Sequence, residues 1–461
     1  MRAPSLMIMI MIGCFVLVAL APVQSGFAQP TPSEPPAFLF TAAKHYQALA
    51  WMHGADRFSS DAIIFLQDAN GRHPLVPGFA ASADPDVSFD GKKVLFAGKR
   101  KPQDHWQIWE VELDGGAVRR VTSCSDNCVR PFYLPGDRVV YAKKAGARFV
   151  LEAAATNLTP GDPHHLTVQL TYGPASFLPT DVLRDGRILF AATYPFGSNG
   201  TPELYTVYSD GSGVESYRCD HGRARHSGKQ LASGDIVFTS QQGLARFTSA
   251  RAEEVRIVAP TGEYAGDIAE TPYGDWLVVW SDGKSPFQLR WWKPGTDLSR
   301  PAAADSLANL LQPALVAERA IPNRHPSGLH DWPNANLLCL NAYTSKYKFV
   351  AGSIHSVRVY TRDNSGIVKL LGSAPVERDG SFFVQLPTEH PLQIELLDAS
   401  GTTLKRQAGW FWMRRGEQRA CVGCHAGPET APENAVPLIL LKSTTPADLT
   451  GAAPHTPSGG Q

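Results

Sequence analysis

The chain contains the stretch Ser88-Phe89-Asp90-Gly91-Lys92-Lys93-Val94-Leu95-Phe96, a polar turn with glycine followed by an apolar strand. The same phrase returns at 134–141, 183–190, 232–238 and 273–279. Its five turn glycines are 45, 50, 48 and 40 residues apart. A period of about 40 to 50 residues is typical of propeller blades, because one small sheet cannot bury both faces and must stack on its neighbours. The repeat predicts a mainly β protein with a β-propeller over 59–349, of about six blades, with seven possible.

The pattern changes on either side of this repeat. Residues 29–58 are expected to form a linker with one short helix at about Thr41–His53, and Ile63–Leu66 and Leu337–Ala342 could close the ring. Beyond Ser353, apolar residues alternate as in strands with one buried face, which predicts a small β-sandwich over 350–408. Residues 409–443 then form a separate short segment, and 444–461 are expected to be a disordered tail.

The charge balance narrows the possible partners. Lysine and arginine (43) equal aspartate and glutamate (43), so the formal net charge is zero. Nucleic-acid binders need a basic excess, so a nucleic-acid partner is not expected.

The N-terminus is typical of a bacterial export signal over residues 1–28. Arg2 is followed by an apolar run, Leu6–Val23, and Gly26-Phe27-Ala28 predicts cleavage before Gln29. The alternative is an uncleaved anchor, since about 18 apolar residues can just span a bilayer. The mature chain is therefore expected to be periplasmic or otherwise exported, and membrane-bound only if the signal is retained.

Six cysteines remain after cleavage. Cys124 and Cys128 lie in one turn-like stretch with no histidine close by in sequence, which favours a local disulfide over a metal pair. Cys219 and Cys339 could pair with each other or stay as buried thiols.

The last two cysteines belong to Cys421-Val422-Gly423-Cys424-His425. This spacing predicts one covalently attached c-type haem, with thioether bonds at Cys421 and Cys424 and His425 as axial ligand to the iron. Attachment requires export, which the N-terminus independently predicts. A thioredoxin-like or zinc-binding Cys-x-x-Cys is the alternative, but no βαβ pattern and no further ligands are seen nearby. We call residues 409–443 the haem segment.

The sequence does not identify the sixth ligand of the haem iron. Met413 lies eight residues before Cys421 and could be the sixth ligand, or it could simply fill an apolar gap. His355, His390 and His455 are further candidates, and an open site is also compatible. Trp410 and Trp412 are expected to pack.

Two other groups of side chains could carry function. The basic residues of and near the haem segment could contact haem propionates, steer an acidic redox partner, or form a solvated face; they are Lys405, Arg406, Arg414, Arg415 and Arg419. Loop histidines could suggest metal sites, although a structural role is the more usual one; they are His221, His226, His325 and His330.

Two resemblances follow from these residues. Asp84–Gly91 and Leu183–Ile188 resemble segments of TolB-like propellers. The run Arg414–His425, with its order of propeller, sandwich and Cys-Val-Gly-Cys-His, resembles the haem-bearing middle domain of the hydrazine synthase α subunit. The resemblance implies an exported haem protein with Cys421, Cys424 and His425 at the haem.

Two departures put hydrazine synthesis itself in doubt. The family's subunit is longer and holds a second haem. It also has a tyrosine shortly after the motif, thought to coordinate the active haem iron. Here the fourth residue after His425 is Glu429, and no tyrosine follows Tyr360.

Three functions remain open at this level. We expect a monohaem c-type electron-transfer protein whose propeller docks a redox partner. The alternatives are a haem enzyme with an open iron site acting on a small nitrogen or oxygen species, and a ligand-binding propeller with a structural haem appendage.

Overall fold

The structure is a computed structural model that describes residues 35–156, 167–194, 200–218, 220–249, 252–423 and 434–451. Nearly all regular elements are strands, with one short 3-10 helix, η1 (Ala50–His53), and one α-helix, α1 (Leu438–Lys442), in this part of the chain. Among the described residues, no helix combines the length and apolar character needed to cross a membrane.

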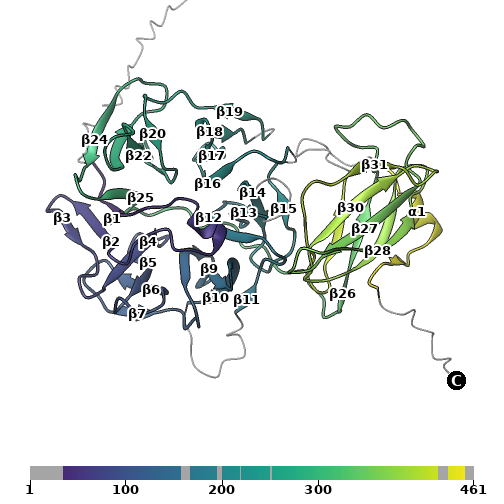
Figure 1. Ribbon diagram of the computed structural model, residues 1–461, viewed down its shortest axis with the longest axis horizontal. Coiled ribbons are helices and arrows are strands. Elements are labelled where there is room, and N and C mark those ends of the chain that lie inside the picture. Colours follow the sequence, from purple (N-terminus) through teal and green to yellow (C-terminus); the bar gives the residue numbers. More distant parts are fainter. Residues whose placement is uncertain are drawn as a thin grey trace, which may run out of the picture. The chain divides into compact units, whose positions relative to one another are not determined.

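Six antiparallel sheets follow one another within the described residues between Phe38 and Leu315, arranged around a common centre (Figure 1). The first sheet orders β25 (Asn309–Leu315), β1 (Phe38–Ala43), β2 (Ile63–Asp68) and β3 (Gly71–Pro74). The second orders β4 (Ala81–Val87), β5 (Lys93–Lys99), β6 (Gln107–Glu112) and β7 (Val118–Arg120). The third orders β11 (Val168–Gln169), β10 (Arg148–Ala155), β9 (Arg138–Ala145) and β8 (Cys128–Leu134).

The fourth sheet orders β12 (Ser176–Val182), β13 (Ile188–Thr193), β14 (Glu203–Val207) and β15 (Glu215–Ser216). The fifth orders β16 (Arg225–Gln230), β17 (Ile236–Ser240), β18 (Gly243–Phe247) and β19 (Glu254–Arg256). The sixth orders β20 (Glu263–Tyr264), β22 (Trp276–Ser281), β23 (Gln288–Trp292) and β24 (Ser299–Ala303), with β21 (Ala269–Glu270) also paired to β22.

The repeated turn phrase connects the first two strands of five sheets. Its glycines all have positive φ, between +72° and +91°, a conformation that L side chains avoid. Gly186 is the most constrained by its surroundings, because an added Cβ would lie 2.2 Å from the carbonyl oxygen of Asn323. The strands that follow are buried, as in Ile188–Thr193, where every residue is buried. The sequence repeat thus marks real β units.

The first and last strands of the repeat lie in the same sheet. Thr41 of β1 lies opposite Leu311 of β25, and the Thr41 hydroxyl donates to Gln312 Oε1 at 2.8 Å. The expectation that Leu337–Ala342 would close the ring is wrong, because β26 (Asn334–Cys339) lies in a sheet of the C-terminal domain. The expected helix over 41–53 is largely wrong as well: β1 continues to Ala43, and only Ala50–His53 is helical.

Two four-stranded sheets form the C-terminal domain. One orders β32 (Gln418–Cys421), β26, β29 (Phe382–Pro387) and β33 (Ala447–Asp448). The other orders β28 (Val368–Pro375), β27 (Ser356–Arg362), β30 (Leu392–Leu397) and β31 (Thr403–Arg406). Buried residues of both sheets, among them Leu337, Val359 and Val384, belong to one apolar cluster, as in a sandwich.

Residues on both sides of the sandwich extend its first sheet. The haem segment contributes β32, and residues 447–448 of the expected tail contribute β33, which pairs with β29. The sandwich therefore includes residues from before 350 and after 408.

Candidate functional site

The described half of the haem motif lies at the edge of the sandwich. Strand β32 runs parallel to β26, with Cys421 opposite Cys339, and Leu340 N–H donates to the Cys421 carbonyl at 2.9 Å. Burial raises the pKa of the Cys421 thiol, an effect that nearby Arg419 opposes. The other two motif residues expected at the haem, Cys424 and His425, lie outside the described residues, as does Glu429.

Gly423, between the two motif cysteines, is packed against backbone. A Cβ at this position would lie 2.1 Å from the Thr344 carbonyl oxygen and 2.8 Å from the Asn341 carbonyl oxygen. The turn from Asn341 to Thr344 is itself closed by a backbone hydrogen bond of 3.0 Å. Glycine is the one residue that fits without displacing this turn, so the cysteine pair begins on a fixed surface.

Three aromatic residues, Trp410 to Trp412, and Met413 precede the motif and are buried. Trp412 is fully buried and packs edge-on against Phe177 of β12 and Tyr172, with ring centroids 5.6 and 6.2 Å apart. Its Nε1 has no hydrogen-bond partner among the described residues. Met413 is also fully buried, and its carbonyl accepts a hydrogen bond from Glu389 N–H at 2.8 Å. The expectation that Trp412 packs is met, whereas iron ligation by Met413 stays a prediction.

The haem segment is also bound to the fourth propeller sheet through a buried carboxylate. Glu417 is 5% exposed and accepts hydrogen bonds from Gly213 N–H at 3.1 Å and from Arg414 N–H at 2.8 Å. It also pairs with Arg419, whose guanidinium donates to the Val214 carbonyl at 3.3 Å. A charge held by this many donors is stable in a buried position.

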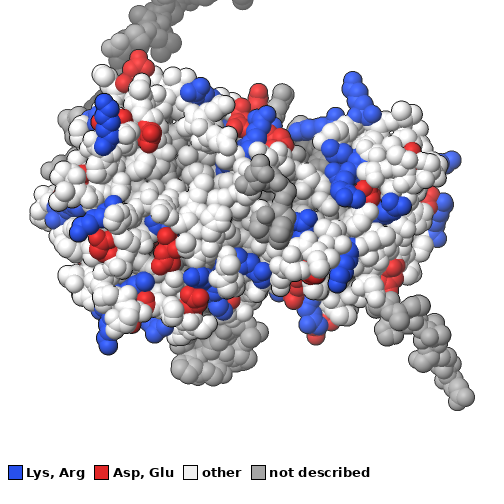
Figure 2. Space-filling model, in the orientation of Figure 1, with Lys and Arg blue, Asp and Glu red and all other residues white. Residues whose placement is uncertain are grey.

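The basic residues near the motif are mostly neutralised inside the protein. Arg419 pairs with Glu417 at 2.6 Å, Arg414 with Glu389 at 3.1 Å and Arg406 with Glu395 at 2.8 Å. Lys405 lies over the Tyr347 ring at 3.7 Å. On the face of the molecule seen in Figure 2, basic and acidic side chains are interspersed. Arg406 and Arg415 are the exposed arginines of the group, and the pairing of Arg406, Arg414 and Arg419 with carboxylates weakens the case for a basic docking face.

His221, His325 and His330 lie in loops and each has a local partner, whereas His226 lies in β16. His221 Nδ1 lies 2.5 Å from Glu203 Oε2, and His325 stacks on Tyr208 with centroids 3.8 Å apart. His330 stacks on Trp332, and burial lowers the pKa of His226 to about 4. Within the described ranges, no three His, Cys, Asp or Glu side chains form a group that could hold a metal.

Two of the remaining cysteines are bonded to each other. Cys124 and Cys128 form a disulfide, four residues apart in sequence. Cys339 is buried beside Cys421, and Cys219 lies outside the described residues.

Sequence reasoning missed a buried charged cluster at the centre of the propeller, formed by Arg57, Asp84, Arg130 and Asp267. The sequence contained a signal for three of these four residues. Asp84, Arg130 and Asp267 each precede a turn glycine of the repeat by six or seven residues. Arg57 lies outside the repeat and had no such signal.

Comparisons with known proteins point to one family. Residues 342–426 match the model of the hydrazine synthase alpha subunit middle domain. Hydrazine synthase subunit alpha of Kuenenia stuttgartiensis is 41% identical over 72 residues, which is 15% of this chain and 9% of that protein.

Solved structures extend the likeness to the fold. The Kuenenia stuttgartiensis hydrazine synthase matches with a TM-score of 0.74 and 17% identity, covering 89% of this chain and 72% of that chain. TolB from Acinetobacter baumannii matches with a TM-score of 0.46 and 11% identity, over 61% of this chain and 67% of that one. The second score is too low to support an argument, so the fold assignment rests on the sheets themselves and on the first match. This chain is therefore hydrazine-synthase-α-like, with a β-propeller followed by a sandwich that matches the middle domain of that subunit.

Proposed function

We propose that this chain is an exported, hydrazine-synthase-like haem protein that carries one c-type haem and acts on a small nitrogen or oxygen species. The observation that carries the proposal is the match of residues 342–426 to the synthase middle domain, because this range includes the whole Cys421-to-His425 motif. The curated relative shares only 9% of its length with this chain, so its activity is not transferred whole.

The residues present fit a c-type haem. Cys421 and Cys424 would form the two thioether bonds, and His425 would be the axial ligand. The Gly423 contact supports this assignment, because a cysteine pair that begins on a rigid turn presents its thiols in a defined direction. When bound, the haem supplies a redox-active iron.

The chain's own residues would shape the surroundings of that iron. Trp412 and Met413 are fully buried and exclude water from the side of the haem segment nearest the propeller. The Glu417–Arg419 pair holds the segment in place through donors on β32 and on the 213–214 turn. A buried and well-supported segment keeps a cofactor in one orientation.

The likeness favours the enzymatic alternative over a simple electron carrier. An electron carrier with the propeller as docking scaffold remains a prediction, and the pairing of Arg406, Arg414 and Arg419 removes part of its support. The family has a tyrosine shortly after the motif, and no tyrosine follows Tyr360 here, so the proposed substrate is a small nitrogen or oxygen species and hydrazine synthesis itself is not proposed.

Haem staining after denaturing electrophoresis tests the cofactor. The purified exported chain should give a stained band, and Cys421→Ser with Cys424→Ser should abolish it. Cys339→Ser is the matched control, because Cys339 lies beside Cys421 in the sheet but outside the motif. An unstained wild-type band would defeat the proposal.

Carbon monoxide distinguishes the two functions. The reduced protein should bind carbon monoxide rapidly, with a shifted Soret band, if one iron position is open. No spectral change would instead indicate a six-coordinate carrier and overturn the enzymatic proposal.

A further inference from the structure

The inner strand of each propeller sheet bends at one polar position. In four sheets, a register shift interrupts the inner strand, which is β4, β8, β12 or β16. In the first sheet, a register shift interrupts the pairing of β25 with β1. In the sixth sheet, the inner strand is divided into β20 and β21. Five residues at these points have positive φ: Asp84, Arg130, Ser227, Asp267 and Gln312. Such bulges re-aim side chains, and here they bring polar groups together at the centre.

The charges that the sheets place at the centre do not balance. Asp86 pairs with Arg319 at 3.0 Å and Asp181 pairs with Lys229 at 3.0 Å, so these carboxylates are neutralised locally. The remaining charged groups at the bends are Asp84, Asp267 and Arg130. Arg130 binds Asp267 through both guanidinium nitrogens and lies 3.9 Å from Asp84. One carboxylate is left over.

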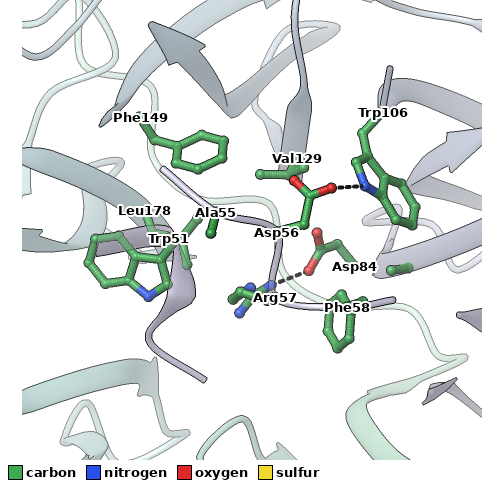
Figure 3. A pocket seen from close by; sticks show the side chains of 11 residues that line it. Trp51, Ala55, Asp56, Arg57, Phe58, Asp84, Trp106, Val129, Phe149 and Leu178 are labelled. Atoms are coloured by element: carbon green, nitrogen blue, oxygen red, sulfur yellow. Dashed lines mark hydrogen bonds and ion pairs between the residues drawn. The ribbon is translucent and has the colours of Figure 1, made fainter. Parts of the chain in front are cut away.

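Arg57 supplies the missing positive charge from outside the sheets. It belongs to residues 44–62, which connect β1 to β2 and which we call the cap. Its side chain is 7% exposed and pairs with Asp84, as Figure 3 shows. Burial by itself would raise the pKa of Asp267, but Arg130 and then Arg57 hold it below its usual value.

The cap is held by the packing of Trp51 and Phe58 into the apolar core and by polar contacts. Asp56 accepts hydrogen bonds from Trp106 Nε1 at 3.0 Å and from Asn127 Nδ2 at 2.9 Å, on the side away from Arg57 (Figure 3). Asn127 lies within the Cys124–Cys128 disulfide loop. The Trp51 carbonyl accepts from the Ser176 hydroxyl at 2.7 Å.

Aromatic rings surround the cavity beside Arg57. Trp51, Phe58, Trp106 and Phe149 line it together with Asp84 (Figure 3). The Arg57 guanidinium lies 5.2 Å from the Phe58 ring centroid. Carboxylates combined with aromatic faces are the groups that recognise guanidinium ions.

We propose that the centre of the propeller is a guanidinium-binding site, which Arg57 fills as an internal plug and which an arginine side chain of a partner protein can occupy in its place. The excess carboxylate gives the site its charge preference, and the aromatic wall gives it shape. The cap must open for exchange, since Arg57 reaches the site from the cap. The proposal does not depend on the haem.

Chemical rescue tests the site. In the full-length chain, Arg57→Ala leaves the excess carboxylate unpaired, and N-methylguanidinium at millimolar concentration should raise its melting temperature by several degrees while leaving the wild type unchanged. N-methylurea, which has a similar shape without charge, should have no effect. The double variant Arg57→Ala/Asp84→Asn lacks the excess charge and should lose the rescue. Equal stabilisation by N-methylurea, or rescue that persists in the double variant, would overturn the proposal.

If Arg57→Ala does not fold, a second variant and a second measurement still test the proposal. Arg57→Met keeps the apolar stem over Phe58 and should be rescued in the same way. In the wild type, N-acetylarginine amide should increase hydrogen–deuterium exchange within residues 44–62, and Asp56→Asn should lower the concentration required. Unchanged exchange in the cap at saturating N-acetylarginine amide would rule out replacement of Arg57 by a partner's arginine.

Discussion

The centre of the propeller and the residues that lead into the haem motif both contain buried side chains, but different forces hold them. At the centre, side chains from four distant parts of the chain meet as ion pairs, with Arg57 against Asp84 and Arg130 against Asp267. In the haem segment, the Glu417–Arg419 pair is joined by backbone contact at Gly423 and by apolar packing at Trp412 and Met413. The first arrangement is sensitive to loss of a single charge, and the second is sensitive to shape.

The largest expected effect is at the centre. Asp84→Ala removes the partner of Arg57 and an acceptor for Gln312, and it leaves a buried guanidinium uncompensated. We expect a loss of about 3–5 kcal/mol in the free energy of unfolding, measured with chemical denaturant. Asp61→Ala is the control, since Asp61 is 43% exposed and its partners, Lys44 and the Ser59 hydroxyl, contact it at the surface. Similar losses in both variants would show that the buried ion pairs at the centre add no more stability than a surface ion pair.

Acid should weaken the centre before the haem segment. Burial lowers the pKa of His226 from 6.5 to about 4, and Arg57 adds to this while Asp267 opposes it. Because the folded-state value is the lower one, the unfolded chain binds the proton first. The contribution of His226 is therefore present above pH 6.5 and is lost as the pH falls towards 4.

The lowering of the His226 pKa from 6.5 to about 4 corresponds to a change of about 3 kcal/mol at most in the free energy of unfolding. The measurement is the pH dependence of unfolding free energy for wild type minus that for His226→Gln, so that other titrating groups cancel. A difference that does not change between pH 7 and pH 4 would contradict the assignment.

The haem segment should respond to added volume. Gly423→Ala places a Cβ 2.1 Å from the Thr344 carbonyl oxygen, so the turn or the motif must move. We expect a loss of about 1–3 kcal/mol in stability and a lower haem-stained fraction. Gly328→Ala is the matched control, because nothing lies within 4 Å of its added Cβ. Full haem loading at wild-type stability would show that Gly423 is not held as the structure has it.

The smallest expected effect is at Met413. Met413→Leu nearly conserves volume, so a stability loss of about 1 kcal/mol or less is expected. The absorption spectrum of the reduced haem protein should be unchanged, because the structure places Met413 in an apolar cluster. Met52→Leu, in the cap, serves as the control. A spectral change confined to Met413→Leu would identify it as an iron ligand.

Local structure could be predicted from the sequence where each residue acts through its near neighbours in the chain. The turn glycine of each repeat, such as Gly91 or Gly186, needs positive φ whatever lies elsewhere, so the β units could be recognised. The strand pairing of β1 with β25 could not be recognised, because Thr41 and Gln312 are 271 residues apart and neither strand indicates its partner. The same limit led to the wrong assignment of Leu337–Ala342 to the ring.

By itself, the sequence determined the repeat and the Cys421-to-His425 motif, since both depend on residues a few positions apart. The tertiary structure alone decided which strands close the first sheet, that Cys339 lies beside Cys421, and that Arg57 meets Asp84. The physical reason is that burial brings remote segments together, and a buried charge is stable only when the completed fold supplies its partner.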